Sequence, residues 1–224
     1  MARVVVTTAE ESAQSALAAG DFSMWLTAMQ GALRGENGSD VPCDGCTACC
    51  TSSQFVHIEP DEIDTLSHIP AELLFAAPRL PPGHVLLGYD ERGHCPMLKE
   101  GRCSIYDHRP RTCRTYDCRV FPAAGIDGDE DKVQIRRRAR RWEFAFPTVT
   151  DRIEHEAVRA AADFLARDRE LVHSSPGANQ TELAVLAIEI HTVFLGRDED
   201  TGEAAVIAPN PDAVRAALAR PIGP

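Results

Sequence analysis

The chain has 224 residues, of which 44% are hydrophobic, so it is long enough to bury a core of ordinary size. Its formal net charge of −11 argues against general nucleic-acid binding, and its apolar runs are too short to span a bilayer. The N-terminal residues show no secretory signal. We therefore expect a cytoplasmic protein, whose reduced cysteines serve a metal or catalysis rather than the disulfides of a secreted domain.

The N-terminal part of the chain is predicted to be helical. Apolar residues recur at helical spacing over residues 9–34, although Gly20 can divide this helix in two. Residues 35–40 have the composition of a linker. Residues 55–58 then predict a short strand, and the acidic stretch 59–62 opens a helix, because acids and an early proline suit a first turn.

The middle of the chain predicts short elements of both kinds. Residues 71–77 lie between two prolines and predict a short helix, and residues 85–89 predict a strand. Residues 94–98 and 102–106 predict a β-hairpin, in which Gly101 supplies the positive φ that the turn needs.

Helices are predicted again towards the C-terminus. A short helix begins after Asp107, a favourable N-cap, and carries Cys113. Amphipathic helices are expected over residues 150–170, 181–195 and 211–220. The fold class that follows is mainly α, or α+β at low strand content, with a compact helical domain around a short β-hairpin and loops.

Three consecutive parts are expected within this arrangement. Residues 1–40 form an N-terminal helical segment, and residues 41–124 form a cysteine-cluster module that binds metal. Residues 125–224 form a C-terminal helical part that packs into the same domain.

A strongly basic stretch covers residues 132–141 and is followed by Trp142, Phe144 and Phe146. Such a stretch can bind an anion, a nucleic acid or a protein partner. The alternative is a solvated helix face that balances nearby acids such as Asp127, and the acidic total favours it. We therefore expect no membrane or nucleic-acid partner and leave a protein partner open. The ligands that we expect are metal ions, because of the cysteines between residues 43 and 118.

The eight cysteines all lie between residues 43 and 118, and four of them fall within eight residues. Zinc and iron need several thiolates that converge at about 2.3 Å, and a C-x-x-C turn points two thiolates into one coordination sphere. This confinement predicts a metal centre rather than buried cysteines that act as small hydrophobes. The candidate ligands are Cys43, Cys46, Cys49, Cys50, Cys95, Cys103, Cys113 and Cys118.

The number of metals is left open by this pattern. Cys49 and Cys50 are adjacent, so their side chains diverge and do not easily share one small tetrahedron. Either one of them is a spectator, or they serve different metals. Eight thiols are enough for a dinuclear site or two clusters, but they do not require either.

Three further residues are expected beside the thiolates. A four-thiolate site is negatively charged, so Arg109 and Arg114 would neutralise it and donate hydrogen bonds. Tyr106 would pack over the site. His57 and His94 are close enough in sequence to act as ligands, but we interpret them as ordinary loop histidines.

The cysteines and their neighbours resemble a known family. The pattern runs C-x-x-C-x-x-C-C from Cys43, C-P-x-L from Cys95, and G-x-C-x-I-Y-x-x-R-P-x-x-C-R from Gly101. It resembles the CxxCxxCC, or YkgJ-like, family over roughly residues 43–122. The resemblance implies zinc or iron chelation but no particular reaction. Related clusters in flagellin lysine methylases imply an iron–sulfur centre.

The chain departs from the family pattern after Cys113, where Cys118 is an eighth cysteine. It either replaces one of the seven ligands or completes a second centre. An all-cysteine set and the Cys95-Pro96 pair favour an iron–sulfur cluster, whereas the ribbon-like hairpin is typical of structural zinc.

We therefore expect a metal-binding protein with an iron–sulfur cluster or another iron centre that can act as a redox group. The alternatives are a structural zinc module that presents a surface to a protein partner, or an enzyme that uses the metal for redox or group-transfer chemistry. The sequence names no catalytic residue.

Overall fold

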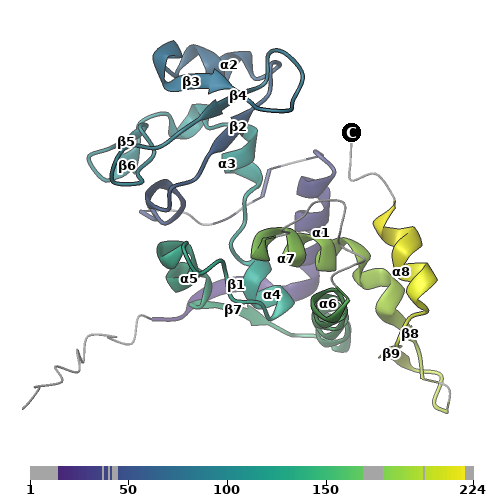
Figure 1. Ribbon diagram of the computed structural model, residues 1–224. Helices are drawn as coiled ribbons and strands as arrows, with labels where there is room; N and C mark the ends of the chain where they lie inside the picture. The colour runs from purple at the N-terminus through teal and green to yellow at the C-terminus, as the bar shows by residue number, and fades with distance from the viewer. Residues whose placement is uncertain are drawn as a thin grey trace, which may run out of the picture.

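The computed structural model describes residues 15–36, 38–39, 41, 45–168, 179–198 and 200–219. Figure 1 shows an upper lobe of short strands and helices and a lower lobe dominated by helices. Of the described residues, 45% are helical and 15% are in strands, which form several small sheets. The expectation of a mainly α protein is therefore wrong, and the fold is mixed α/β. The strands are two to five residues long, too short to leave a clear period-2 pattern in the sequence.

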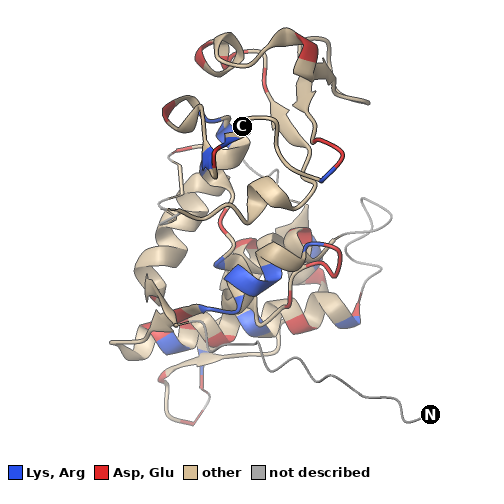
Figure 2. Cartoon of the chain, turned by 90° about the vertical axis from the view of Figure 1, so that its left-hand side faces the viewer, with Lys and Arg blue, Asp and Glu red and all other residues tan. Residues whose placement is uncertain are grey.

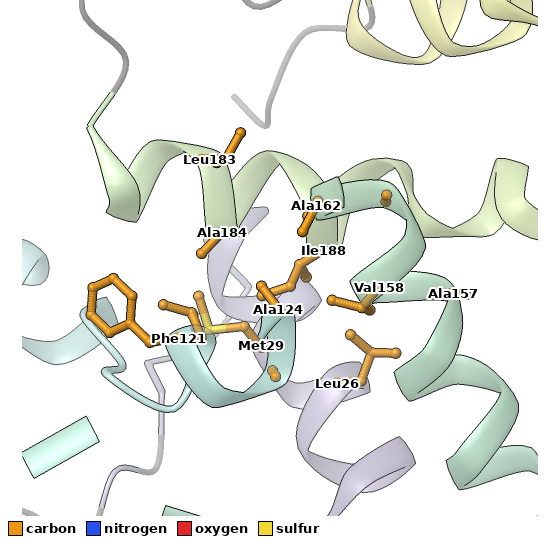
Figure 3. Close-up of a cluster of buried hydrophobic side chains, with 14 of the residues drawn as sticks. Leu26, Met29, Phe121, Ala124, Ala157, Val158, Ala162, Leu183, Ala184 and Ile188 are labelled. Atoms are coloured by element: carbon orange, nitrogen blue, oxygen red, sulfur yellow. The ribbon is translucent and has the colours of Figure 1, made fainter. Parts of the chain in front are cut away.

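Four helices of the lower lobe enclose the larger hydrophobic core (Figure 3). Burying a side chain such as Leu26, Val158 or Ile188 contributes roughly 1.5–3 kcal/mol each. The two helices predicted over residues 150–170 and 181–195 form within a few residues of those ranges, and each begins with a capping box. The four helices are α1 (Phe22–Leu33), α4 (Val120–Ala124), α6 (Val149–Arg167) and α7 (Gln180–Ile190).

The helix predicted over residues 9–34 is partly wrong. Strand β1 (Leu17–Asp21) precedes α1 and pairs in parallel with β7 (Trp142–Ala145). Gly20 has a φ of +92°, which a helix does not allow, and the hydrogen-bond partners of β1 lie in a distant part of the chain. Residues 9–14 lie outside the described part of the chain.

The upper lobe is built on a three-stranded antiparallel sheet in the order β2 (Val56–Ile58), β4 (Val85–Leu87), β3 (Leu74–Ala76). The helix predicted over residues 71–77 is wrong, because only Ala71–Leu73 form a 3₁₀ turn, η2, and the next residues pair with β4. A smaller core lies under this sheet. It consists of Val56, Ile58, Ile69, Leu87, Met97 and Ile105.

The remaining elements are short. The predicted hairpin forms as β5 and β6, whereas the β8–β9 hairpin, which follows the last helix of the core, was not predicted. Among the described residues, no helix is long and apolar enough to cross a membrane. The elements are η1 (Cys49–Thr51), α2 (Ile63–Ser67), β5 (Leu98–Lys99), β6 (Arg102–Cys103), η3 (Tyr106–His108), α3 (Arg111–Thr115), α5 (Val133–Ala139), η5 (His191–Phe194), β8 (Leu195–Arg197), β9 (Ala204–Val206) and α8 (Pro211–Leu218).

A buried carboxylate lies on the chain between α3 and α4. The side chain of Asp117, just after α3, has no exposed surface and pairs with Arg119 at 2.7 Å. Its Oδ2 also accepts hydrogen bonds from Trp25 Nε1 at 2.9 Å and Ser39 Oγ at 2.8 Å. Arg119 in turn donates to the carbonyl of Ala19 at 3.1 Å. This network fixes the chain where it enters and where it leaves the cysteine-rich segment.

Replacing Asp117 with Ala should lower the free energy of unfolding by about 3–5 kcal/mol, because Arg119 would stay buried without its partner. Urea unfolding followed by circular dichroism measures this change. The matched control is Asp127→Ala, since Asp127 is half exposed and pairs with Arg136 and Arg140 at the surface. Asp127→Ala should lower the free energy of unfolding by less than about 1 kcal/mol. Equal losses in the two variants would contradict the role given to Asp117.

Candidate metal centre

Six cysteines from four chain segments line one cavity of about 370 Å³ in the upper lobe. The first segment leads into η1, the second leads into the hairpin, the third is β6 and the fourth is α3. Among the described residues, no disulfide bond joins two of these cysteines. The cavity-lining cysteines are Cys46, Cys49, Cys50, Cys95, Cys103 and Cys113.

The first segment is held as a tight turn that leads into η1. Thr51 Oγ1 donates to the carbonyl of Thr47 at 3.0 Å, and Ser52 Oγ donates to the carbonyl of Ala48 at 2.7 Å. The amide of Cys95 donates to the carbonyl of Cys50 at 2.7 Å. That bond places the second segment directly against the first, so their thiols face the same space.

The hairpin brings Cys103, the thiol of the third segment, to the cavity. Cys103 lies opposite Leu98 in the β5–β6 register, and the amide of Leu98 donates to the carbonyl of Cys95 at 2.9 Å. Glu100 and Gly101 have φ values of +50° and +75° in the turn. The prediction of a hairpin with Gly101 at positive φ is therefore confirmed, although its strands are shorter than expected.

Helix α3, the fourth segment, carries Cys113. It is anchored by a residue whose role the sequence did not predict. The buried Glu62 accepts a hydrogen bond from the amide of Arg111 through its Oε2, at the start of this helix. Thr112 Oγ1 donates to the carbonyl of His57 at 2.7 Å. The acidic stretch after residue 58 suggested a helix start there, but nothing local indicated that Glu62 caps a helix about 50 residues away.

Four of the thiols lie in one another's electrostatic field. The pKa of the Cys113 thiol is raised to about 12. Burial is the largest cause, and the neighbouring thiols of Cys50, Cys95 and Cys103 add to it. Cys113 is enclosed by protein on most sides, but it faces the open cavity and so keeps an exposed surface. Burial also raises the pKa of Cys95. Cys95 and Cys113 therefore favour the neutral form unless a cation shares the cavity, and a bound metal ion reverses this preference.

Two of the three expected neighbours lie at the cavity. Tyr106 and Arg109 both line it, with Arg109 Cζ 3.6 Å from the centre of the Tyr106 ring. The Arg109 Nε atom is buried and has no hydrogen-bond partner among the described residues. A negatively charged thiolate centre fits this unsatisfied donor. Arg114 instead points towards Glu62, at 3.9 Å from its carboxylate, and does not line the cavity.

Two of the eight cysteines are not placed at this cavity. Cys118 is buried in the core of the lower lobe, where its Sγ accepts a hydrogen bond from Trp142 Nε1 at 3.1 Å. Cys43 lies outside the described residues. The sequence marked Cys118 as a departure from the family pattern, but it did not show that this thiol lies in the other lobe.

The described thiols surround the cavity rather than meeting at one point. No three of the cysteine sulfurs in the described part of the chain lie within 4.8 Å of one another. In a zinc tetrahedron with Zn–S bonds of about 2.3 Å, sulfurs would lie about 3.8 Å apart. The spacing therefore leaves more room than a single four-coordinate ion needs.

A second cavity, of about 560 Å³, adjoins the first. Thr112 and Tyr116 line both cavities, so α3 forms a wall between them. Burial raises the pKa of Tyr116, and the thiols of Cys49 and Cys118 raise it further. Met29, Leu33 and Val185 contribute apolar surface to the second cavity.

Much of the basic stretch forms α5, which carries three consecutive arginines and is coloured blue over that part in Figure 2. Arg136 and Arg140 both pair with Asp127, as the charge-balancing interpretation expects. Trp142, by contrast, is buried in the core of the lower lobe, and Phe144 packs against it.

Comparison with known proteins gave one match. Residues 42–139 match the family model CxxCxxCC, described as "Putative zinc- or iron-chelating domain". No curated protein and no solved structure matched the chain. The match covers all cysteines of the chain, and it supports metal binding without distinguishing zinc from iron. Residues 42–139 of this chain are therefore similar to the domains that the CxxCxxCC family model describes.

Proposed function

We propose that the cysteine cavity holds an iron–sulfur cluster and that the protein uses it in electron transfer or redox sensing. One observation carries this proposal: six thiols line a single cavity of about 370 Å³, and no three of those described converge on one point. A cluster of several irons is larger than a single ion and accepts thiolates on opposite sides. When bound, such a cluster supplies one-electron chemistry.

The side chains around the cavity support a negatively charged centre. Arg109 offers a buried Nε–H that no other described group uses, and its guanidinium is held over the Tyr106 ring. Hydrogen bonds and charge next to the sulfurs are the means by which a protein tunes such a cluster. Cys50, Cys95, Cys103 and Cys113 are the favoured ligands, because they line one cavity and come from four different segments around it.

The alternative is a structural zinc module that presents a surface to a protein partner. An exposed group of aromatic rings beside the cavity favours this alternative. Phe55, Phe75 and Tyr89 are each more than 40% exposed, and Phe55 lies 5.9 Å and 4.9 Å from the other two rings. An enzyme is the third candidate, since the second cavity would place a substrate next to α3. For each candidate we propose a cytoplasmic location, because the cysteine spacing suits reduced thiols that bind metal.

Elemental analysis of protein purified without oxygen separates iron from zinc. We expect iron with acid-labile sulfide, about four irons per chain, and absorption near 400 nm. A colourless protein with one or two zinc ions per chain would contradict the iron–sulfur proposal and support the structural module.

Cysteine variants test which thiols hold the metal. Cys103→Ser and Cys113→Ser should each lose most of the bound metal and unfold more readily, because metal-binding free energy contributes to folding. Cys118→Ser is the matched control, since this thiol is buried in the other lobe. It should keep the full metal content. Metal per chain and the melting temperature are the measurements, and full metal content in Cys103→Ser would defeat the ligand assignment.

Arg109→Gln should weaken metal retention about 10–100-fold, because the centre loses a charge and a hydrogen-bond donor. In an iron–sulfur form it should also lower the reduction potential, since the more negative reduced state depends most on a nearby cation. Metal loss to a chelator and a redox titration measure the two effects. Arg92→Gln is the control, because Arg92 is exposed and pairs only locally with Asp90. Identical behaviour of the two variants would refute the role of Arg109.

A further inference from the structure

A second group of metal-ligating side chains lies outside the cysteine cavity. It consists of Asp64 and His68 in and after α2 and His108 at the end of η3. In Figure 1, α2 lies at the top of the upper lobe, away from the helical lobe. Tertiary folding brings the group together, because His108 is 44 residues from Asp64 in sequence.

The three side chains offer one ligand atom each within 4.8 Å of one another. His108 Nδ1 lies 2.8 Å from one carboxylate oxygen of Asp64, and His68 Nδ1 lies 3.7 Å from the other. Ligands about 2.1 Å from a shared metal ion are about 3.0–3.4 Å apart. The observed distances lie on either side of this range.

The two imidazole rings are stacked face to face, with their centres 3.6 Å apart. This places both rings beside the same carboxylate. The side chains of His68 and His108 are about 40% exposed and that of Asp64 is 70% exposed. A metal ion therefore reaches them from solvent, and each exposed side chain can turn its ligand atom towards the ion.

The chemistry of this set differs from that of the cysteines. Two imidazoles and one carboxylate suit divalent zinc, cobalt, nickel or iron, and they leave positions open for water. None of the three residues lines the cysteine cavity. The other stacked histidine pair, His57 and His84, has rings 4° from parallel and a nitrogen–nitrogen distance of 2.9 Å. That pair forms no such three-ligand group within the described residues.

We propose that Asp64, His68 and His108 form a second, solvent-exposed binding site for a divalent transition-metal ion, separate from the cysteine centre. The site takes nitrogen and oxygen ligands only. Its exposure makes the bound ion readily exchangeable, in contrast to an ion surrounded by the thiols of the cysteine cavity. The proposal does not depend on which metal the cysteines hold.

Cobalt(II) is the probe, added to full-length protein that keeps its native metal in the cysteine cavity. Equilibrium dialysis should show one additional cobalt per chain. Its spectrum should lack the intense near-ultraviolet bands of cobalt–thiolate bonds. The double variant His68→Gln/His108→Gln and the single variant Asp64→Asn should each weaken this binding at least about ten-fold.

His84→Gln is the matched control, because it removes an imidazole from the other stacked pair and should bind cobalt like the wild type. Melting curves without cobalt verify that every variant is folded, and cobalt should raise the melting temperature only where the three ligands are intact. The proposal is wrong if the wild type takes up no additional cobalt. It is equally wrong if folded double-variant protein takes up as much as the wild type, or if the added cobalt is bound by thiolates.

Discussion

The buried ion pair between Asp117 and Arg119 fixes the chain between α3, which carries Cys113, and α4 in the core of the lower lobe. A carboxylate without water around it is costly unless charged and polar partners satisfy it. Here Arg119, Trp25 and Ser39 do so from different segments. Ser39 precedes the first cysteines and Asp117 follows α3 directly. One interaction therefore fixes both ends of the segment that supplies the thiols.

The upper lobe has little apolar surface with which to hold the thiols in place. Its core has six buried side chains, whereas the lower lobe has a much larger one. Four short chain segments surround the cavity, and backbone hydrogen bonds such as that from Cys95 to Cys50 hold them together. Small cores usually need a further source of stability, and a bound metal provides one. Metal binding and the folding of this lobe are therefore expected to be coupled.

The charges around the cavity favour a bound cation, and Arg109 lines the same cavity. Burial and the neighbouring thiols of Cys50, Cys95 and Cys103 raise the pKa of Cys113, so without a cation nearby Cys113 stays neutral. A cation reverses this preference, and the Nε–H of Arg109 has no other hydrogen-bond partner among the described residues. On the outer surface, Asp64 and two histidines offer harder ligands to solvent. The two groups therefore select metals by different chemistry and with different access.

The sequence by itself determined the features that depend on near neighbours. The spacing of the cysteines predicted a metal centre and its family, Gly101 predicted the hairpin turn, and the apolar period predicted α6 and α7. Only the tertiary structure decided features that need distant partners. Trp142 keeps Cys118 in the other lobe, Glu62 caps α3, and β7 turns the start of the expected first helix into β1. The physical reason is that helix periods and turns are local, whereas hydrogen bonds between distant segments leave no pattern in either segment alone.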